Sequence, residues 1–269
     1  MYLNYSKQLD YFNQYMKNKI DAPYTIKGDH LSNLDKDVFR EINDFYEINK
    51  NIINASETFP LFIRRQSLSY YLAKYELYKK TLDVKGSIVE CGSHQGSSLL
   101  LFAKLTSIFE PYQIHKKVIS FDTFAGFPSI DKKNHNIKHK NTKKNYLNNT
   151  NLGLIKNSIK LLDKNRFNGH INKVEIVKGD AIKTIPNYLK ENRHCLVSLL
   201  YLDFDIYKPT KIALDHFLPR MPKGGLVVFD ELNQKRWYGE TVAYLEKFSK
   251  NKVELKQFNF EPNISYFKI

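Results

Sequence analysis

The sequence predicts an open α/β fold, a Rossmann-like sheet of seven mostly parallel strands with helices on both faces. From Gly86 onward, short apolar runs of strand length alternate with segments of helical periodicity. Strands that alternate with helices form parallel sheets with right-handed crossovers. The last two apolar runs are separated by only a short turn, so they must pair as an antiparallel hairpin.

The individual elements follow from the position of each run. Five apolar runs predict parallel strands over 87–91, 117–121, 174–178, 195–204 and 225–229. Periodic segments predict helices over 97–105, 181–191, 210–218 and 240–249. Two further strands, over 253–260 and 264–267, are predicted to close the chain around Glu261-Pro262-Asn263.

The first 82 residues contain no convincing strand and predict a helical cap. Helical spacing covers 37–48 and 61–82. The second segment carries a stripe that we interpret as core packing, with a substrate pocket as the alternative. The stripe comprises Leu68, Tyr71, Leu72, Tyr75, Tyr78 and Leu82. We therefore predict a cap over 1–82 and an α/β domain over 83–269, within one compact unit.

A basic insertion over 129–153 interrupts the α/β domain after the second strand. Residues 131–144 contain six lysines and one aspartate, followed by an Asn-rich stretch. A long loop without secondary structure inside a compact domain is usually functional or disordered. We keep two interpretations of this segment, a solvated loop and a mobile basic lid over the site.

Composition limits the class of protein. The chain has 269 residues, of which 42% are hydrophobic and 26% charged, which excludes a disordered or collagen-like chain. The net charge of +14 favours polyanions or negatively charged surfaces without identifying one. No window approaches the roughly 18 apolar residues of a membrane span, and no signal-peptide pattern is seen. Cys91 and Cys195 fit small buried residues in a reducing compartment, so we expect a cytoplasmic protein.

The first strand ends in a glycine-containing turn, Glu90-Cys-Gly92-Ser-His-Gln-Gly96-Ser-Ser98. Its Gly-x-x-x-Gly spacing matches neither the dinucleotide fingerprint nor the Walker phosphate loop. Glu90 would repel a pyrophosphate but suits a ligand with a positive centre, such as S-adenosylmethionine. We predict that Glu90, Gly92, Gly96 and Ser98 contact this cofactor. An ordinary strand-to-helix turn is the alternative.

Aspartates follow the second and third strands. Asp122 occupies the position where an acid accepts hydrogen bonds from ribose hydroxyls in nucleoside-binding sheets. A turn or cap aspartate is the alternative at this position. Asp180 is predicted on the adenine side of the cofactor, although it could equally cap the next helix.

Four acids follow the fourth and fifth strands, namely Asp203, Asp205, Asp230 and Glu231. Asp203 and Asp205 are two residues apart, so on a strand they point to the same side. If the two strands are neighbours, four carboxylates crowd one edge and their pKa values rise. A hard divalent cation such as Mg²⁺ prefers carboxylate ligands and would relieve this repulsion. Cofactor binding or helix capping without a metal is the alternative.

Four motifs together resemble the macrocin O-methyltransferase family. They occur in the family's order as Glu90-Cys-Gly92, Asp122–Pro128, Leu202–Thr210 and Gly224–Glu231. The resemblance extends from about Phe59 to Phe248. It implies an enzyme that depends on S-adenosylmethionine and a metal ion and that methylates sugar hydroxyls of natural products.

The resemblance also implies roles for individual acids. Asp203, Asp230 and Glu231 match the positions that hold magnesium, and Asp205 matches the proposed general base. The chain has Glu231 where the family often has a second aspartate.

At the cofactor side, the resemblance matches Glu90, Gly92 and Asp122 to contact positions. The stretch Gly179-Asp180-Ala181 departs from an aromatic-containing family version.

The predicted function is therefore S-adenosylmethionine-dependent, metal-assisted O-methylation of a sugar hydroxyl. The acceptor could be a glycan, a nucleotide-linked sugar or a glycosylated natural product, and the basic insertion mildly favours a phosphorylated one. The alternatives are a hydroxylase-like enzyme on the same sheet, a noncatalytic sugar-binding protein and a nucleic-acid-binding protein. Nucleic acid is not the expected partner, because no RNA-binding signature is present and the acidic edge would repel phosphates. The N-terminal helices could form a homodimer.

Overall fold

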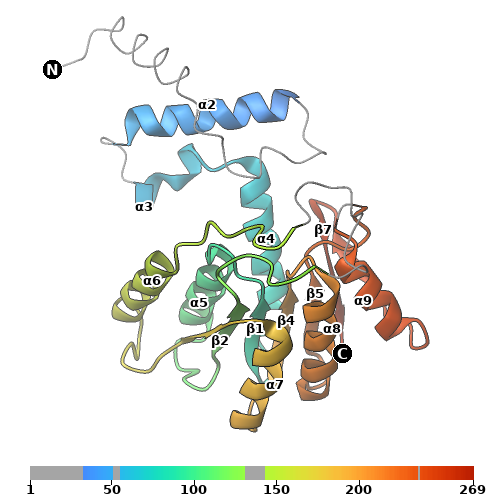
Figure 1. The fold of residues 1–269 in the computed structure, drawn as a ribbon. Helices are drawn as coiled ribbons and strands as arrows, with labels where there is room; N and C mark the ends of the chain where they lie inside the picture. The colour runs from blue at the N-terminus through green and yellow to red at the C-terminus, as the bar shows by residue number, and fades with distance from the viewer. Residues whose placement is uncertain (1–32, 51–54, 131–142, 236) are drawn as a thin grey trace, which may run out of the picture. The chain divides into compact units, whose positions relative to one another are not determined.

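The computed structural model describes residues 33–50, 55–130, 143–235 and 237–269 (Figure 1). The chain divides into two compact units, one ending at Leu68 and one spanning Ser69–Ile269. Of the lysine-rich segment, residues 131–142 lie outside the described residues, so the predicted loop or lid is not addressed there. No helix in the described part of the chain is long and apolar enough to cross a membrane.

The described part of the first unit is helical, as predicted. It contains α2 (Asn33–Asn49), α3 (Ala55–Thr58), η2 (Phe59–Leu61) and the start of α4 (Arg65–Lys79). Pro60 lies within the first turn of η2, where its missing N–H is not needed. Helix α4 begins at Arg65, four residues later than the expected Leu61. The division between the units falls inside α4, and a functional cap ending at residue 82 stays a prediction.

A seven-stranded sheet forms the second unit, with strand order β3-β2-β1-β4-β5-β7-β6. The first five strands are parallel, and β7 runs antiparallel to both β5 and β6. Their bounds are β1 Ser87–Cys91, β2 Val118–Asp122, β3 Val174–Lys178, β4 Val197–Leu202, β5 Leu226–Phe229, β6 Lys256–Phe258 and β7 Glu261–Lys268. The predicted fold class is confirmed. The strand order reverses between β1 and β4, which is where open α/β sheets bind ligands.

Helices cover both faces of this sheet (Figure 1). The helices α7 (Ala181–Glu191), α8 (Tyr207–Phe217) and α9 (Gly239–Phe248) pack on one face. The other face is covered by α5 (Ser97–Phe109), α6 (Leu152–Lys164) and the part of α4 after Leu68. A short helix, η3 (Leu218–Arg220), follows α8. Because both faces are covered, β1, β4 and β5 are buried at every position, which explains why these strands are mostly apolar.

The buried face of α4 differs from the predicted stripe. Tyr78 is fully buried as expected, but Leu68 and Leu72 are exposed. The buried side also includes Lys74, whose side chain is only 1% exposed. Because a lysine counts as polar in a hydrophobic pattern, the apolar spacing did not predict which side of α4 faces the core.

Several predicted element bounds were shifted by one to four residues, and one helix was not predicted. The strand β4 ends at Leu202, two residues before the predicted end. Helix α6 was not anticipated because the Asn-rich stretch before it resembled a loop. Asn151 is in fact the cap of this helix, its side chain accepting a hydrogen bond from the Leu154 N–H at 3.0 Å.

The terminal hairpin is present, but its turn lies earlier than predicted. The pair Phe258–Glu261 closes the hairpin, so Pro262 lies inside β7 rather than in the turn. The strand β5 pairs with β7 only as far as Ser265. The missing N–H of Pro262 therefore faces no β5 partner, which is how a proline is tolerated in a strand.

Candidate active site

The carboxyl ends of four parallel strands meet at one edge of the sheet. Cys91 pairs with Phe121 on one side and Leu202 on the other, and Leu202 pairs with Phe229. The ladder continues one step further, since the Asp203 N–H donates to the Cys91 carbonyl at 2.8 Å. The adjacency of β4 and β5, on which the predicted acidic cluster depended, is thus confirmed.

The acids after β4 lie in a loop rather than on the strand. Asp205 has a positive φ of 60°, so the predicted strand alternation does not place it beside Asp203. The two are nevertheless close enough to interact. Burial raises the pKa of Asp203 well above its usual value, and the charges of Asp230 and Asp205 add to this effect. By accessible surface Asp203 and Asp205 are only partly buried, which leaves them reachable from solvent.

Asp205 and Glu231 are brought together from the loops after β4 and β5. Burial raises the pKa of Asp205 well above its usual value, and the neighbouring charges of Glu231 and Glu240 raise it further. A hydrogen bond between the Asp205 and Glu231 side chains also favours the protonated form. The predicted crowding of carboxylates at this edge is therefore present.

Glu240, at the start of α9, joins the two acid-bearing loops. Its side chain is 0% exposed. One oxygen accepts the N–H groups of Phe204 at 3.1 Å and Asp205 at 3.3 Å, and the other accepts the N–H of Glu231 at 3.4 Å. The carboxylate also lies in the first turn of a helix, where negative charge is favoured. Sequence reasoning treated Glu240 only as the beginning of a helix.

Asp230 is held by two tyrosines. Its Oδ1 atom accepts hydrogen bonds from the hydroxyl groups of Tyr70, on α4, and Tyr201, on β4. Only 7% of Asp230 is exposed. A cation also reaches this region, because the Lys74 ammonium lies 3.7 Å from the centre of the Tyr70 ring and 4.9 Å from that of Tyr201.

Lys74 connects the acidic loops to the turn after β1. Its ammonium donates a hydrogen bond to the Ser98 hydroxyl at the start of α5. Burial lowers the pKa of Lys74, while the charges of Asp230, Asp203 and Glu90 oppose that shift. Lys74 is therefore a buried amine within reach of both groups of acids, whose charges favour its protonated form. No motif signals it, because it lies 16 residues before Glu90 in an ordinary helical pattern.

Glu90 is fully buried at the end of β1. One carboxylate oxygen accepts a hydrogen bond from the Ser93 hydroxyl at 2.5 Å, and that hydroxyl also contacts Ser120 at 2.6 Å. The other oxygen, Oε1, is buried and has no hydrogen-bond partner among the described residues. Burial raises the pKa of Glu90 to about 7, against the opposing effects of Ser93 and Lys74. A buried acceptor without a partner is a position where a ligand donor fits.

Gly92 brings the turn after β1 against the loop after β4. It has a φ of +94°, and a Cβ atom there would lie 1.9 Å from the Asp203 carbonyl oxygen. Only glycine permits this conformation and this approach. The two loops that carry the predicted cofactor and metal residues are therefore in direct backbone contact.

Asp122 organises the backbone around the same turn. Its two oxygens accept the N–H groups of His94 at 2.8 Å and Phe124 at 2.6 Å. Both of these residues have positive φ values, 42° and 52°. Asp122 thus fixes two turns at once, and its proposed contact with a ribose remains a prediction.

The remaining predicted cofactor residues have visible structural roles. Gly96 begins α5 with a φ of +79°, and Asp180 caps α7 by accepting the Ile182 N–H at 3.0 Å. The helix cap that we considered for Asp180 is therefore present, while its adenine-side role stays a prediction. Ser98 is 9% exposed and binds Lys74, as described above.

A cluster of aromatic rings supports the loops beyond the sheet edge. The ring of Phe127 lies 5.8 Å from that of Trp237 and 6.0 Å from that of Tyr146. Phe127 and Tyr146 both lie in the connection after β2, Trp237 follows β5, and Ile206 from the loop after β4 joins them. Sequence reasoning did not find this cluster, because its members come from three separate loops.

The donor chemistry at β4 and β5 fits a hard divalent cation. Several carboxylates are crowded there, and a buried lysine and hydrogen bonds offset part of their charge. Within the described residues, however, no three acidic, histidine or cysteine side chains already form a metal-binding group. Binding would therefore need some rearrangement of these side chains.

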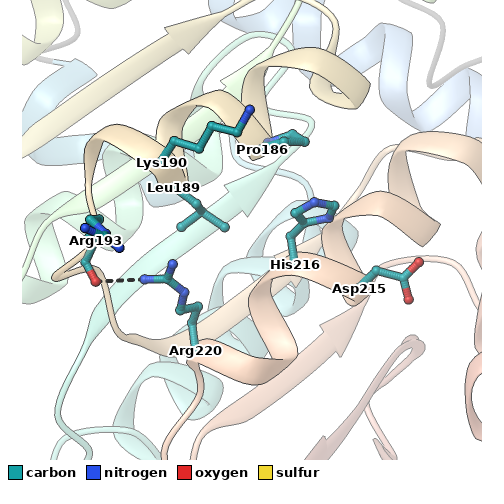
Figure 2. Close-up of a pocket in the computed structure, with 7 residues that line it drawn as sticks. All are labelled: Pro186, Leu189, Lys190, Arg193, Asp215, His216 and Arg220. Carbon is teal, nitrogen blue, oxygen red and sulfur yellow. Dashed lines mark hydrogen bonds between the residues drawn. The ribbon is translucent and has the colours of Figure 1, made fainter.

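A separate cleft of about 390 Å³ lies between α7 and α8. Figure 2 shows Leu189 and Pro186 on α7 facing His216 on α8, with Arg220 hydrogen-bonded to the Arg193 carbonyl at 2.9 Å. None of the predicted site residues lines this cleft. It is distinct from the acidic edge of the sheet.

Comparison with known proteins identifies the family. The model of the macrocin O-methyltransferase (TylF) family matches residues 76–258, which is more than half of the chain. The chain belongs to the macrocin O-methyltransferase family. It is accordingly an O-methyltransferase. Among curated proteins, no match was found.

Solved structures agree with this family. The structure of CalS11, a calicheamicin methyltransferase, is 28% identical with a TM-score of 0.83, covering 93% of this chain and 98% of that one. An apo structure of CalS11, described as a TDP-rhamnose 3'-O-methyltransferase, is 29% identical with a TM-score of 0.76, covering 89% and 96%. The O-methyltransferase NovP is 18% identical with a TM-score of 0.52, covering 74% and 79%, and so shares the fold.

Proposed function

We propose that this enzyme transfers a methyl group from S-adenosylmethionine to a sugar hydroxyl with the help of a divalent metal ion. The observation that carries the proposal is the meeting of the acidic loops after β4 and β5 with the turn after β1, where Gly92 touches Asp203. Membership of the macrocin O-methyltransferase family supports the reaction. The similarity to a TDP-rhamnose 3'-O-methyltransferase supports a sugar acceptor.

The turn after β1 is the proposed cofactor site. The Oε1 atom of Glu90, buried and without a hydrogen-bond partner among the described residues, would accept from a positively charged centre of the cofactor. Gly92, Gly96 and Ser98 would line the turn beside it. Asp122 would accept from the ribose hydroxyls with the lone pairs that its two backbone contacts leave available.

Asp203, Asp230 and Glu231 are the proposed ligands of a magnesium ion. When bound, the cofactor supplies the methyl group and the metal ion makes a hydroxyl of the acceptor more acidic. Asp205 is the proposed general base. Even with its raised pKa, an aspartate is too weak a base to deprotonate an unassisted alcohol, so Asp205 needs this assistance.

The protein's own residues position the cofactor turn and the two acidic loops relative to one another. The contact of Gly92 with the Asp203 carbonyl fixes the cofactor turn against the acidic loop, and Glu240 fixes the two acidic loops together. Holding two reactants in line can contribute roughly 7–11 kcal/mol to catalysis. Asp205 then accepts the hydroxyl proton as the methyl group is transferred.

A nucleotide-linked sugar is our preferred acceptor among the three predicted classes. The net charge of +14 and the lysines of the insertion favour a phosphorylated substrate. The description of CalS11 as acting on TDP-rhamnose points the same way.

Methyl transfer from labelled S-adenosylmethionine tests the proposal. The purified enzyme is incubated with nucleotide sugars, glycans and glycosylated natural products, with and without chelator. We expect a labelled sugar that disappears in excess EDTA and returns with Mg²⁺. Asp203→Asn should lower the rate by at least about 100-fold, because even residues that only support a metal ligand are worth 10- to 100-fold. Binding of S-adenosylmethionine should be nearly unchanged, and full turnover in chelator would refute the metal role.

We also propose a cytoplasmic location and a homodimer. The free, buried thiols of Cys91 and Cys195 support a reducing compartment. Exposed apolar side chains on α2, at Val38, Phe45 and Ile48, support a contact between two copies. Light scattering during gel filtration would measure the mass in solution.

A further inference from the structure

Two tyrosines converge on a single oxygen of Asp230. The hydroxyl groups of Tyr70 and Tyr201 both donate to Oδ1, and they lie 3.4 Å from each other. Tyr201 lies on β4, beside the strand β5 that Asp230 follows, whereas Tyr70 comes from α4, about 160 residues earlier in the chain.

We propose that Tyr70 and Tyr201 are positioning residues that orient Asp230 for binding of the divalent cation. With Oδ1 fixed by two donors, the carboxylate cannot rotate freely and its Oδ2 atom is left for the ion. Carboxylates that bind metals are characteristically hydrogen-bonded by a second group in this way. This inference rests on the proposed function, because it assumes that Asp230 is a metal ligand.

Lys74 holds the two tyrosines in place. Its ammonium lies over both rings, 3.7 Å from the centre of Tyr70 and 4.9 Å from that of Tyr201, and is fixed by Ser98. A cation over an aromatic face is attracted by the ring, and the attraction grows when water is excluded. The tyrosine rings are therefore held independently of their hydroxyls, so removal of a hydroxyl should leave the rings where they are.

The helix supplies a matched control. Tyr78 lies on α4 two turns after Tyr70 and also donates its hydroxyl to a carboxylate, that of Glu110. Tyr78 is fully buried, and Glu110 pairs with Lys116 at 2.7 Å, outside the proposed metal site. Tyr78→Phe thus removes the same kind of hydrogen bond from the same helix without touching Asp230.

The test measures Mn²⁺ binding by electron paramagnetic resonance in the full-length protein, before any turnover. We expect the Tyr70→Phe and Tyr201→Phe variants each to bind Mn²⁺ more weakly, and the double variant about 10- to 100-fold more weakly. The Tyr78→Phe variant should bind Mn²⁺ like the unmodified enzyme even if it melts at a lower temperature. Calorimetry should show nearly unchanged affinity for S-adenosylmethionine in all variants.

Each other outcome has a clear meaning. Unchanged Mn²⁺ affinity in the double variant overturns the positioning role while leaving the proposed function intact. Equal weakening in Tyr78→Phe also overturns it, because the effect would then reflect general destabilisation. If the unmodified enzyme binds no Mn²⁺, the metal part of the proposed function fails first. Should the double variant not fold by circular dichroism, Tyr70→Phe alone decides, since Tyr70 is only partly buried.

Discussion

The two halves of the ligand-binding edge differ in how their acids are satisfied. At the ends of β1 and β2, Asp122 accepts two backbone N–H groups and Glu90 accepts a serine hydroxyl. At the ends of β4 and β5, Asp205 faces Glu231, another acid, and the charges of neighbouring carboxylates raise its pKa. In the first half the acids are satisfied mainly by hydrogen bonds, apart from the Oε1 atom of Glu90, whereas in the second half the acids also crowd one another and lie close to the buried Lys74.

The two halves are therefore preorganised for their ligands in different ways. The turn after β1 is shaped by backbone geometry, through Gly92 and Asp122, and so its form is set by folding. The acidic half is assembled by side chains, with Glu240 joining the loops and Lys74 supplying a buried cation. We therefore expect changes in the acidic half to alter stability and metal binding, and changes near β1 to alter cofactor binding.

Glu240→Ala should produce the largest effect on stability. It leaves the partly buried N–H groups of Phe204, Asp205 and Glu231 without their acceptor, and each such loss costs up to about 1–3 kcal/mol. Relief of repulsion from Asp230 and Glu231 offsets part of this, so we expect a net loss of about 2–4 kcal/mol in urea unfolding. Glu240→Gln should be milder, because its amide oxygen can still accept from Phe204 and Asp205. An alanine variant as stable as the unmodified enzyme would contradict the joining role.

Glu90 offers a pH-dependent test of the cofactor half. Burial raises its pKa to about 7, so the folded protein holds this proton more tightly than the unfolded chain does. The resulting stability is fully present below the ordinary pKa of about 4.5 and is lost as the pH rises through about 7. Glu90→Gln should therefore gain melting temperature over the unmodified protein at pH 8 and gain little at pH 5.

Cofactor affinity should move in the opposite direction. If ionised Glu90 pairs with a positive centre, the unmodified enzyme should bind S-adenosylmethionine more tightly as the pH rises through about 7. Glu90→Gln should bind roughly 10- to 100-fold more weakly at pH 8, the usual value of a hydrogen bond to a charged group. Calorimetry over pH 6–8.5 measures the affinity of the unmodified enzyme and of the Glu90→Gln variant for S-adenosylmethionine. A glutamine variant with unchanged affinity at pH 8 would remove Glu90 from the cofactor site.

The sequence predicted what depends on neighbouring residues along the chain. Alternating apolar runs gave the strand ranges of β1 and β3 to the residue, and the acids after β4 and β5 were expected at one edge. It could not predict what depends on distant residues. Tyr70, Lys74 and Glu240 reach the site from helices whose patterns look like ordinary packing, and no local spacing relates them to Asp230. The end of β4 was wrong because Asp203–Asp205 continues a polar–apolar alternation while its backbone turns at Asp205.

Asp180 gives the smallest and most discriminating test. It caps α7 through the Ile182 N–H, so Asp180→Ala should cost about 1 kcal/mol in unfolding free energy. That loss alone says nothing about the adenine-side role. Asp180→Ser keeps a capping oxygen but shortens the side chain and removes its charge, so it should restore most of the stability. If Asp180 also binds the cofactor, the serine variant should still bind S-adenosylmethionine more weakly. Normal cofactor affinity in a stable serine variant would leave Asp180 as a helix cap and would place cofactor recognition at Glu90 and Asp122.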